Sequence, residues 1–392
     1  MENNHPDRLS IGIVHNISSI GEAEWDACLL DTPGGDDHPF LYHRYLDLLE
    51  RSGAIDGQVW QARYLTVRNG AGALVAAVPL FLKTGSFADF IYEAPWVQAL
   101  ENAGGRYYPR LVVAAPFAPV SGPRLLMRRG APPELPMMLV RLMTDIAGRN
   151  GFSGVHATFV NASDLAVFNA AGWHTRTANL FHWHNRGYAD FDDFLATLTC
   201  RKRGMIRKER QRIAESGIDI HVLTGADLRE EHMDAFARLY PRTFVKNNIV
   251  PHLPRDFFLM LGERMADDIL LVMAREGGRW VGATLNFLGR RTLYCRSWGG
   301  DSNQSLLHFE VTNYRGMDYV IRHGLTTLDG GIGGMFKVKR GYQPVPVWSA
   351  HHFSNQSLHA AVGRSLETER VGVERQMVEI AKQGPYRLPG EQ

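Results

Sequence analysis

Residues Leu293 to Ser349 read LYCRSWGGDSNQSLLHFEVTNYRGMDYVIRHGLTTLDGGIGGMFKVKRGYQPVPVWS. The first six, Leu293 to Trp298, have the composition of a strand, and a polar loop with glycines follows. The next segment predicts a helix, because apolar and aromatic residues recur on one face: Phe309, Tyr314, Met317, Val320 and Ile321. Gly324 stands where a helix is expected to end, and a short strand ends at Leu328. This stretch therefore predicts a strand, a helix and a second strand in succession.

Glycines dominate the segment after this unit: Gly324, Gly330, Gly331, Gly333, Gly334 and Gly341. They bracket four charged residues, Asp329, Lys337, Lys339 and Arg340. Glycine lets backbone amides and neighbouring cations approach a ligand closely, so the segment suits an anionic or carbonyl-bearing ligand. The alternative interpretation is a flexible loop with solvated charges.

The motifs of this half resemble the C-terminal half of Fem-type aminoacyltransferases: LHFE, Asp329-Gly330-Gly331-Ile332, Phe336-Lys337 and Arg340-Gly341-Tyr342. The chain is still more similar to predicted N-acyltransferases of the GNAT superfamily, described as peptidoglycan biosynthesis or recognition proteins. This similarity covers nearly the whole chain. Matching segments include Trp25-Asp26, Pro39-Phe40-Leu41, Pro79 to Lys83, Tyr107-Tyr108-Pro109, Pro116 to Val120, Gly122 to Leu126, Phe181-His182-Trp183, Arg201 to Arg212 and Pro385-Tyr386-Arg387.

Composition describes an ordinary globular protein with enough residues for two domains. The 392 residues are 45% hydrophobic and 21% charged, and the net charge of +2 gives no global signal for nucleic-acid binding. Three widely spaced cysteines, Cys28, Cys200 and Cys295, form neither a zinc pattern nor a disulfide framework, which suggests a reducing compartment. The start MENNHPDR lacks an apolar segment, and no apolar run approaches 18 residues. We expect a cytoplasmic protein without a membrane span.

An internal repeat sets the expected architecture. Three strands are predicted within residues 61–96, the last of them in FADFIYEAPW, and three more within residues 269–298. In each copy a helix and a strand follow: Glu134 to Asn150 with Val155 to Phe159, and Leu307 to His323 with Thr326 to Leu328. We expect a first domain over residues 8–180 with an insertion at 100–133, a second over 181–355, and a C-terminal helix and tail over 356–392.

The fold class expected is α/β of the α+β type, with tandem GNAT-like domains. Each domain would hold a mixed, mostly antiparallel and splayed sheet flanked by helices. The resemblance further implies that donor and acceptor enter the splay from opposite sides, the first domain being the acceptor side and the second the donor side. The PFAPVSGPR segment with Arg124 is either the wall of an acceptor groove or a packed connection, since proline makes it rigid.

The most charged segment runs from Arg201 to Ile213. On a helix, Arg203, Arg207 and Arg210 share one face while the two isoleucines of the segment share another, so a cationic stripe can stand out from a docked helix. Such a stripe, together with Arg201, could bind the phosphates of a donor or of a nucleotide-linked acceptor. The alternative is a solvated face without a ligand.

The chemistry implied by the resemblance is attack of an amine on an activated ester or thioester, giving an amide. Lys337 is expected to stabilise the developing oxyanion, with Asp329, Glu310 and His308 steering or deprotonating the amine. Further residues expected to contact substrate are Phe336, Arg340, Tyr342, Trp298, His182 and Arg124. His182, His184 and His156 lack an acidic partner, so we expect no metal, and no redox cofactor either.

The donor is either aminoacyl-tRNA or acyl-coenzyme A. The segment WGGDSNQS lacks the coenzyme A loop of simple GNAT enzymes, which favours aminoacyl-tRNA over acyl-coenzyme A. The acceptor would be an amine-bearing small molecule or peptide, and the pathway a specialised one. A third interpretation is a non-catalytic module that recognises peptidoglycan or peptides, since a binder of anions would keep Lys337 and Arg340 as well.

Overall fold

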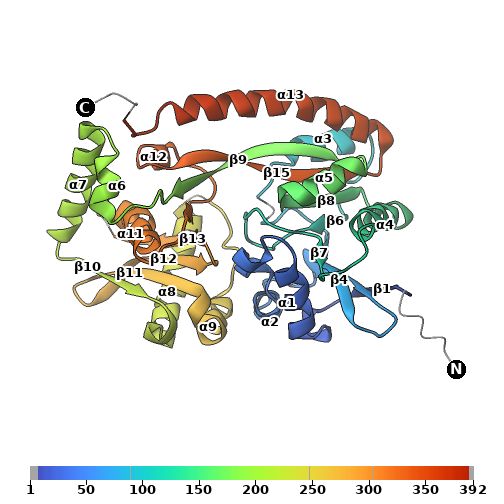
Figure 1. Ribbon diagram of the computed structural model, residues 1–392, viewed down its shortest axis with the longest axis horizontal. Helices are drawn as coiled ribbons and strands as arrows, with labels where there is room; N and C mark the ends of the chain where they lie inside the picture. Colours follow the sequence, from blue (N-terminus) through green and yellow to red (C-terminus); the bar gives the residue numbers. More distant parts are fainter. Residues whose placement is uncertain (1–7, 89, 247, 303, 388–392) are drawn as a thin grey trace. The chain divides into compact units, whose positions relative to one another are not determined.

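The computed structural model describes residues 8–88, 90–246, 248–302 and 304–387 (Figure 1). These residues form two compact units: unit 1 is Met1–Ala178 with Pro346–Glu374, and unit 2 is Asn179–Val345 with Arg375–Gln392. The chain passes between units inside β9 (His174–His184), β15 (Gln343–Phe353) and α13 (Gln356–Ala381). The chain returns to unit 1 at Pro346, inside β15, whereas the sequence suggests that the second domain ends at residue 355. Among the described residues, no helix combines the length and apolarity needed to cross a membrane.

Unit 1 contains two sheets. The four-stranded sheet is antiparallel, in the order β1 (Ser10–Val14), β3 (Tyr64–Arg68), β4 (Leu74–Val78), β7 (Leu126–Met127). The second sheet is mixed, in the order β15, β8 (Gly154–Val160), β6 (Arg110–Val113), β5 (Leu80–Lys83), β2 (Trp60–Ala62). The helices are α1 (Glu22–Asp31), α2 (His43–Arg51), α3 (Ala94–Asn102), α4 (Leu135–Arg149), α5 (Ala162–Ala170) and the first part of α13.

The third strand predicted for the first repeat is wrong. The described residues of this segment, 87–88 and 90–96, form no strand, because Ala88 and Phe90 have positive φ values of 58° and 56°, and Pro95 lies in the first turn of helix α3. The strand that pairs in parallel with β8 is β6, which lies inside the presumed insertion 100–133. That segment also supplies β7 to the other sheet. It is therefore part of the core of unit 1.

Unit 2 is built on one sheet with helices around it. Its strands follow the order β10 (Asp219–Leu223), β11 (Ile269–Glu276), β12 (Arg279–Leu288), β13 (Thr292–Gly300), β14 (Thr327–Asp329), β9. All neighbours are antiparallel except β13 and β14. The helices are α6 (Phe191–Ala196), α7 (Cys200–Ala214), α8 (Glu230–Lys246), α9 (Arg255–Arg264), α10 (Leu307–Phe309), α11 (Arg315–Arg322) and α12 (Met335–Val338).

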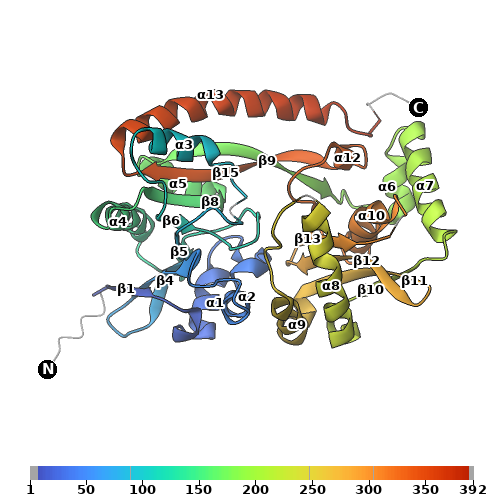
Figure 2. The same cartoon turned by 180° about the vertical axis from the view of Figure 1, so that it is seen from behind.

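The predicted strand, helix and strand of the opening stretch are present in unit 2. The helix carries an irregularity, a π-helical turn at Glu310–Tyr314 between α10 and α11. Its apolar face is buried, with Tyr314, Met317 and Val320 at 0% exposure. A fully buried large apolar side chain contributes on the order of 1.5–3 kcal/mol, so packing on the sheet fixes this helix. Figure 2 shows α8 lying across β12 and β13 in the same unit.

Candidate active site

A glycine turn connects β14 to α12. Gly331, Gly333 and Gly334 have φ values of 68°, 76° and 94°, which side-chain-bearing residues rarely adopt. Two backbone hydrogen bonds fasten the turn to β9: the Gly330 amide donates to the Phe181 carbonyl at 2.8 Å, and the Phe181 amide donates to the Gly331 carbonyl at 3.2 Å. The turn is thus a fixed platform at the end of a strand.

Asp329, the last residue of β14, anchors this platform. Its side chain is 2% exposed, and its Oδ1 lies 2.6 Å from Arg296 Nη2 and accepts a 2.7 Å hydrogen bond from the Gly331 amide. His182 Nε2 lies 3.6 Å from Oδ2. Burial opposes ionisation of this carboxyl, but the Arg296 charge, the nearby His182 and the hydrogen bond from the Gly331 amide hold its pKa well below its usual range. Such a carboxylate is a poor base, so we assign Asp329 a positioning role.

Lys337 places an ammonium group at the turn from the first turn of α12. Its Nζ donates to the carbonyls of Gly330 at 2.5 Å and Ile332 at 3.0 Å. The rings of Phe181 and Phe336 lie 6.0 and 5.8 Å away. Burial lowers the pKa of Lys337 to about 8, although the charge of Asp329 opposes this. The group is charged at neutral pH and is held by the backbone of the turn.

His308 lies in the same part of unit 2, on α10. Its ring contacts those of Trp298 and Phe336 at centroid distances of 5.1 and 5.7 Å. Burial, with the charges of Lys337 and Arg340, lowers the pKa of His308 to about 4. Its Nδ1 is buried and makes no hydrogen bond to the described residues. The imidazole is therefore neutral at pH 7. It is a weak base in the free protein, so its Nδ1 can hold a proton only transiently.

Arg340 is part of the scaffold around this site. It is 4% exposed and donates to Glu209 at 2.7 Å, to the Tyr314 hydroxyl at 2.8 Å and to the Phe336 carbonyl at 3.0 Å. Its guanidinium carbon lies 3.5 Å from the centroid of the Phe309 ring. These contacts join α7, the π-helical turn and α12. Arg340 thus supports the site, in contrast to the substrate contact expected from the sequence.

Other residues expected to contact substrate take different places. Tyr342 is 1% exposed, and its ring packs against Gly330 so closely that a Cβ there would lie 2.7 Å away. Arg124 belongs to unit 1 and is 0% exposed, donating to the carbonyls of Thr158, Val120 and Pro123. Of the two interpretations of the segment around Arg124, these contacts favour the packed connection.

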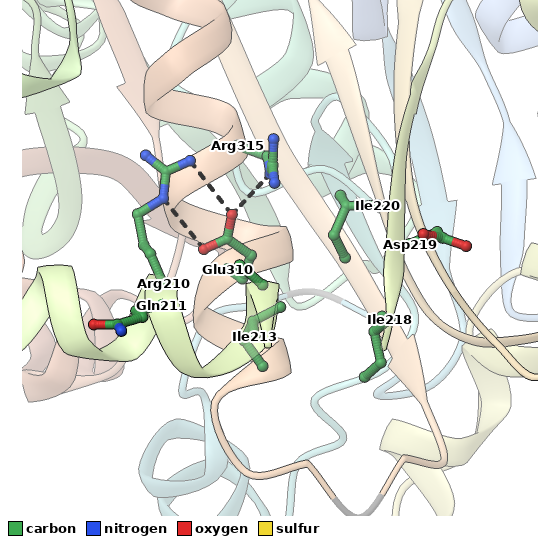
Figure 3. Close-up of a pocket in the computed structure, with 9 residues that line it drawn as sticks. Arg210, Gln211, Ile213, Ile218, Asp219, Ile220, Glu310 and Arg315 are labelled. Atoms are coloured by element: carbon green, nitrogen blue, oxygen red, sulfur yellow. Dashed lines mark hydrogen bonds and ion pairs between the residues drawn. The ribbon is translucent and has the colours of Figure 1, made fainter. Parts of the chain in front are cut away.

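Glu310 is separated from Lys337 and His308 by the shape of its own helix. Its side chain is 3% exposed and forms ion pairs with Arg315 at 2.8 Å and Arg210 at 3.4 Å (Figure 3). Burial raises its pKa, with the two arginines opposing. Because Glu310 pairs with Arg210 of α7, the expected role of this carboxylate in steering or deprotonating the amine does not fit its position.

The basic helix exists, but the predicted cationic face is largely occupied. Arg210 pairs with Asp318 at 2.7 Å, Arg207 pairs with Asp192 at 2.8 Å, and Arg203 donates to the Cys200 sulfur at 3.2 Å. The exposed face carries Arg201, Lys208 and Arg212. Lys208 follows Arg201 by about two helical turns, and Arg212 follows it by about three. Burial lowers the pKa of Lys202, and the charges of Arg201 and of the exposed Lys339 lower it further, so Lys339 lies near the N-terminal end of α7.

Arg296 is the functional residue that the sequence did not indicate. A β-bulge places it out of register, since Leu285 pairs with Ser297 and the next residue, Asn286, pairs with Cys295. A bulge re-aims one side chain, and here the re-aimed side chain meets Asp329. The available signal was an arginine within the otherwise apolar strand LYCRSW.

Comparison with known proteins identifies the family. The chain matches the FemAB-like family, described as peptidoglycan biosynthesis/recognition, over residues 16–388 and belongs to it. Among similar solved structures, FemX has a TM-score of 0.52 and 13% identity, and the match covers 88% of this chain and 98% of FemX. The C-terminal domain of a putative lysylphosphatidylglycerol synthetase from Agrobacterium fabrum has a TM-score of 0.51 and 10% identity, with 82% of this chain and 94% of that domain covered. A tandem GNAT protein from the clavulanic acid biosynthesis pathway has a TM-score of 0.46 and 13% identity, with coverages of 89% and 99%. No match was found among curated proteins. The expected α/β fold class, with mixed, mostly antiparallel sheets flanked by helices, is confirmed, and the fold is similar to that of FemX.

Proposed function

We propose that this protein is an N-acyltransferase that moves an acyl or aminoacyl group from an activated donor to an amine. The observation that carries the proposal is that the Lys337 ammonium and the His308 imidazole contact the same aromatic ring, that of Phe336, at 5.8 and 5.7 Å. Acyl transfer to an amine needs a cation for the developing oxyanion and an acceptor for the amine proton. Membership of the FemAB-like family supports the same class of reaction.

In the proposed mechanism, the acceptor nitrogen attacks the carbonyl carbon of the donor ester or thioester. The carbonyl oxygen becomes negative beside the Lys337 ammonium, which the Gly330 and Ile332 carbonyls hold in place. His308 takes the proton that the attacking nitrogen loses as it forms the amide bond. The tetrahedral adduct then collapses, breaking the bond from the carbonyl carbon to the oxygen or sulfur of the leaving group, and the proton on His308 passes to that leaving atom. Asp329 and Arg296 keep the turn in register throughout.

We favour aminoacyl-tRNA as donor. The exposed cations of α7 and Lys339 form an extended basic surface, which suits a polyanion better than a single phosphate. Acyl-coenzyme A is the second candidate, because a GNAT-like fold and an oxyanion site would serve a thioester equally well. The acceptor is an amine-bearing small molecule or peptide.

The decisive experiment supplies both donors. Purified protein is incubated with charged tRNA pools and with acyl-coenzyme A pools, together with candidate amines, and acyl loss and amide formation are followed by mass spectrometry. Product formation that RNase abolishes identifies an aminoacyl-tRNA donor, whereas RNase-resistant product identifies the thioester. Binding of peptides without amide formation from either pool would favour the non-catalytic module instead.

Neutralising the exposed face of α7 should weaken donor binding. Replacing Arg201, Lys208 and Arg212 with Gln removes three cations, so the slope of log binding constant against log salt should become shallower by about 2–3. The melting temperature should hardly change, because these side chains are exposed. Filter binding of tRNA over a salt series measures the slope. A matched control replaces the exposed Arg364, Arg375 and Lys382 of α13 and its end, and equal weakening in both triple variants would contradict a specific surface.

The pH dependence should report the charge of Lys337. A lysine is protonated below its pKa, so stabilisation by Lys337 should be lost as pH rises through about 8. Ionisation of the acceptor amine affects all variants alike. We therefore expect the ratio of the wild-type rate to that of Lys337→Arg, whose guanidinium stays charged, to fall between about pH 7 and 9. A constant ratio over this range would show that the Lys337 charge does not limit the rate.

A further inference from the structure

A cavity of about 340 Å³ lies in unit 2, between the end of α7, strand β10 and the π-helical turn (Figure 3). Its walls differ in character. Arg210, Glu310 and Arg315 form a polar wall, and Ile213, Ile218 and Ile220 form an apolar one. The acyl-transfer mechanism uses none of these side chains. Pockets of this size are at the small end for ligand sites.

The polar wall contains two buried atoms without hydrogen bonds. Glu310 is 3% exposed, and its Oε2 lies 3.4 Å from Arg210 Nε yet accepts no hydrogen bond in the described structure. Arg315 Nε lies 2.8 Å from Glu310 Oε1, but its N–H is likewise not used in a hydrogen bond. An unsatisfied acceptor and an unsatisfied donor thus lie side by side, and leaving such groups unpaired is costly.

The charge of Arg210 is already balanced. Its guanidinium donates to Asp318 Oδ2 at 2.7 Å and lies 4.4 Å from the centre of the Phe191 ring. Glu310 and Arg315 pair with each other at 2.8 Å, but Oε2 of the carboxylate and the Nε–H of the guanidinium keep unused hydrogen-bonding capacity. A ligand that engages both groups carries a donor cation and an acceptor anion close together.

The apolar wall faces the charged pair. Ile218 and Ile220 alternate along β10 with Asp219, and Figure 3 shows both isoleucines on the side of Glu310 and Asp219 on the other. Ile213 and Ile218 are 2% and 6% exposed. This wall offers an environment for a short branched hydrocarbon.

We propose that this cavity binds a free aliphatic α-amino acid, with its ammonium on Glu310, its carboxylate on Arg315 and its side chain on the isoleucines. The π-helical turn is what aims Glu310 into the cavity, and such turns frequently accompany functional sites. The inference is independent of acyl transfer, because binding of a free amino acid requires no donor.

Calorimetric titration of the full chain with three isosteric probes tests the proposal. The probes are L-leucine, its decarboxylated analogue isopentylamine and its deaminated analogue 4-methylpentanoate. We expect leucine to bind at least about 10-fold more tightly than either analogue, because each analogue forgoes one of the two charged contacts, either with the buried Glu310 carboxylate or with the Arg315 guanidinium. Leucine failing to bind, or either analogue binding equally well, would overturn the proposal.

Two variants locate the binding. Ala214→Trp places a large ring at the rim from the exposed last residue of α7 and should abolish leucine binding, whereas Ala196→Trp makes the same change at the exposed last residue of α6 and should leave it intact. Glu310→Gln should weaken leucine binding about 10-fold and leave 4-methylpentanoate unaffected. If Glu310→Gln does not fold, the tryptophan pair decides alone. Unchanged binding in Ala214→Trp would place the amino acid elsewhere and refute the site.

Discussion

Lys337→Met is expected to reduce turnover by about 100-fold to 1,000-fold, which is the usual cost of losing one preorganised stabiliser of an oxyanion. The Lys337 ammonium is fixed by two carbonyls of the glycine turn, so it needs little reorganisation when negative charge develops next to it. Methionine keeps much of the length and removes the charge. Turnover at saturating donor and acceptor, followed by mass spectrometry of the amide product, measures the effect.

Lys337 also closes the turn, so a structural contribution must be separated from a catalytic one. Lys337→Arg keeps the charge but presents a planar fork in the space of a compact ammonium, and we expect it to restore little turnover. Lys382→Met, at an exposed lysine of unit 2, serves as the matched control and should be fully active. Circular dichroism and melting temperature report folding. A folded Met variant with near-normal turnover would refute the assignment, as would an Arg variant with wild-type turnover.

The regular elements of unit 2 could be predicted because their signals are local. The helix around Tyr314 follows from apolar spacing, and the glycine turn follows from residues whose positive φ values the structure confirms. The basic helix was also correctly placed as α7. The exposed face of α7 was not predicted correctly, because the rotation of a helix about its axis depends on the elements that it packs against. Arg210 meets Asp318 and Glu310, whose proximity no local pattern reveals.

The site depends on irregularities that periodicity does not describe. Regular alternation assigns the residues of β13 to two faces, and the bulge at Arg296 breaks that alternation where the side chain must reach Asp329. The π-helical turn likewise changes the phase of the helix after His308. On any helix, residues two positions apart point about 200° away from each other. His308 accordingly contacts Trp298 and Phe336, whereas Glu310 pairs with Arg210 and Arg315. The sequence suggests a shared reaction for them because both belong to the LHFE motif of the family resemblance.

Asp329→Asn should lower the free energy of unfolding of unit 2 by about 3–5 kcal/mol, the usual cost of removing one partner of a buried ion pair. Asp329 and Arg296 have side-chain exposures of 2% and 7%, and their atoms lie 2.6 Å apart. Asparagine keeps the shape of the side chain but leaves the Arg296 charge without its carboxylate and weakens the bond to the Gly331 amide. Urea unfolding followed by circular dichroism measures the loss.

An exposed pair in the same unit provides the control for this loss. Arg207 and Asp192 lie 2.8 Å apart, but their side chains are 58% and 74% exposed, so Asp192→Asn should cost at most about 1 kcal/mol. The double variant Arg296→Met with Asp329→Asn should recover part of the stability lost in Asp329→Asn, because no uncompensated charge then remains buried. It should not recover turnover, since the carboxylate that holds the Gly331 amide is still missing. Equal losses in Asp329→Asn and Asp192→Asn would show that the Asp329–Arg296 pair does not anchor the turn, and the positioning role assigned to Asp329 would then have to be abandoned.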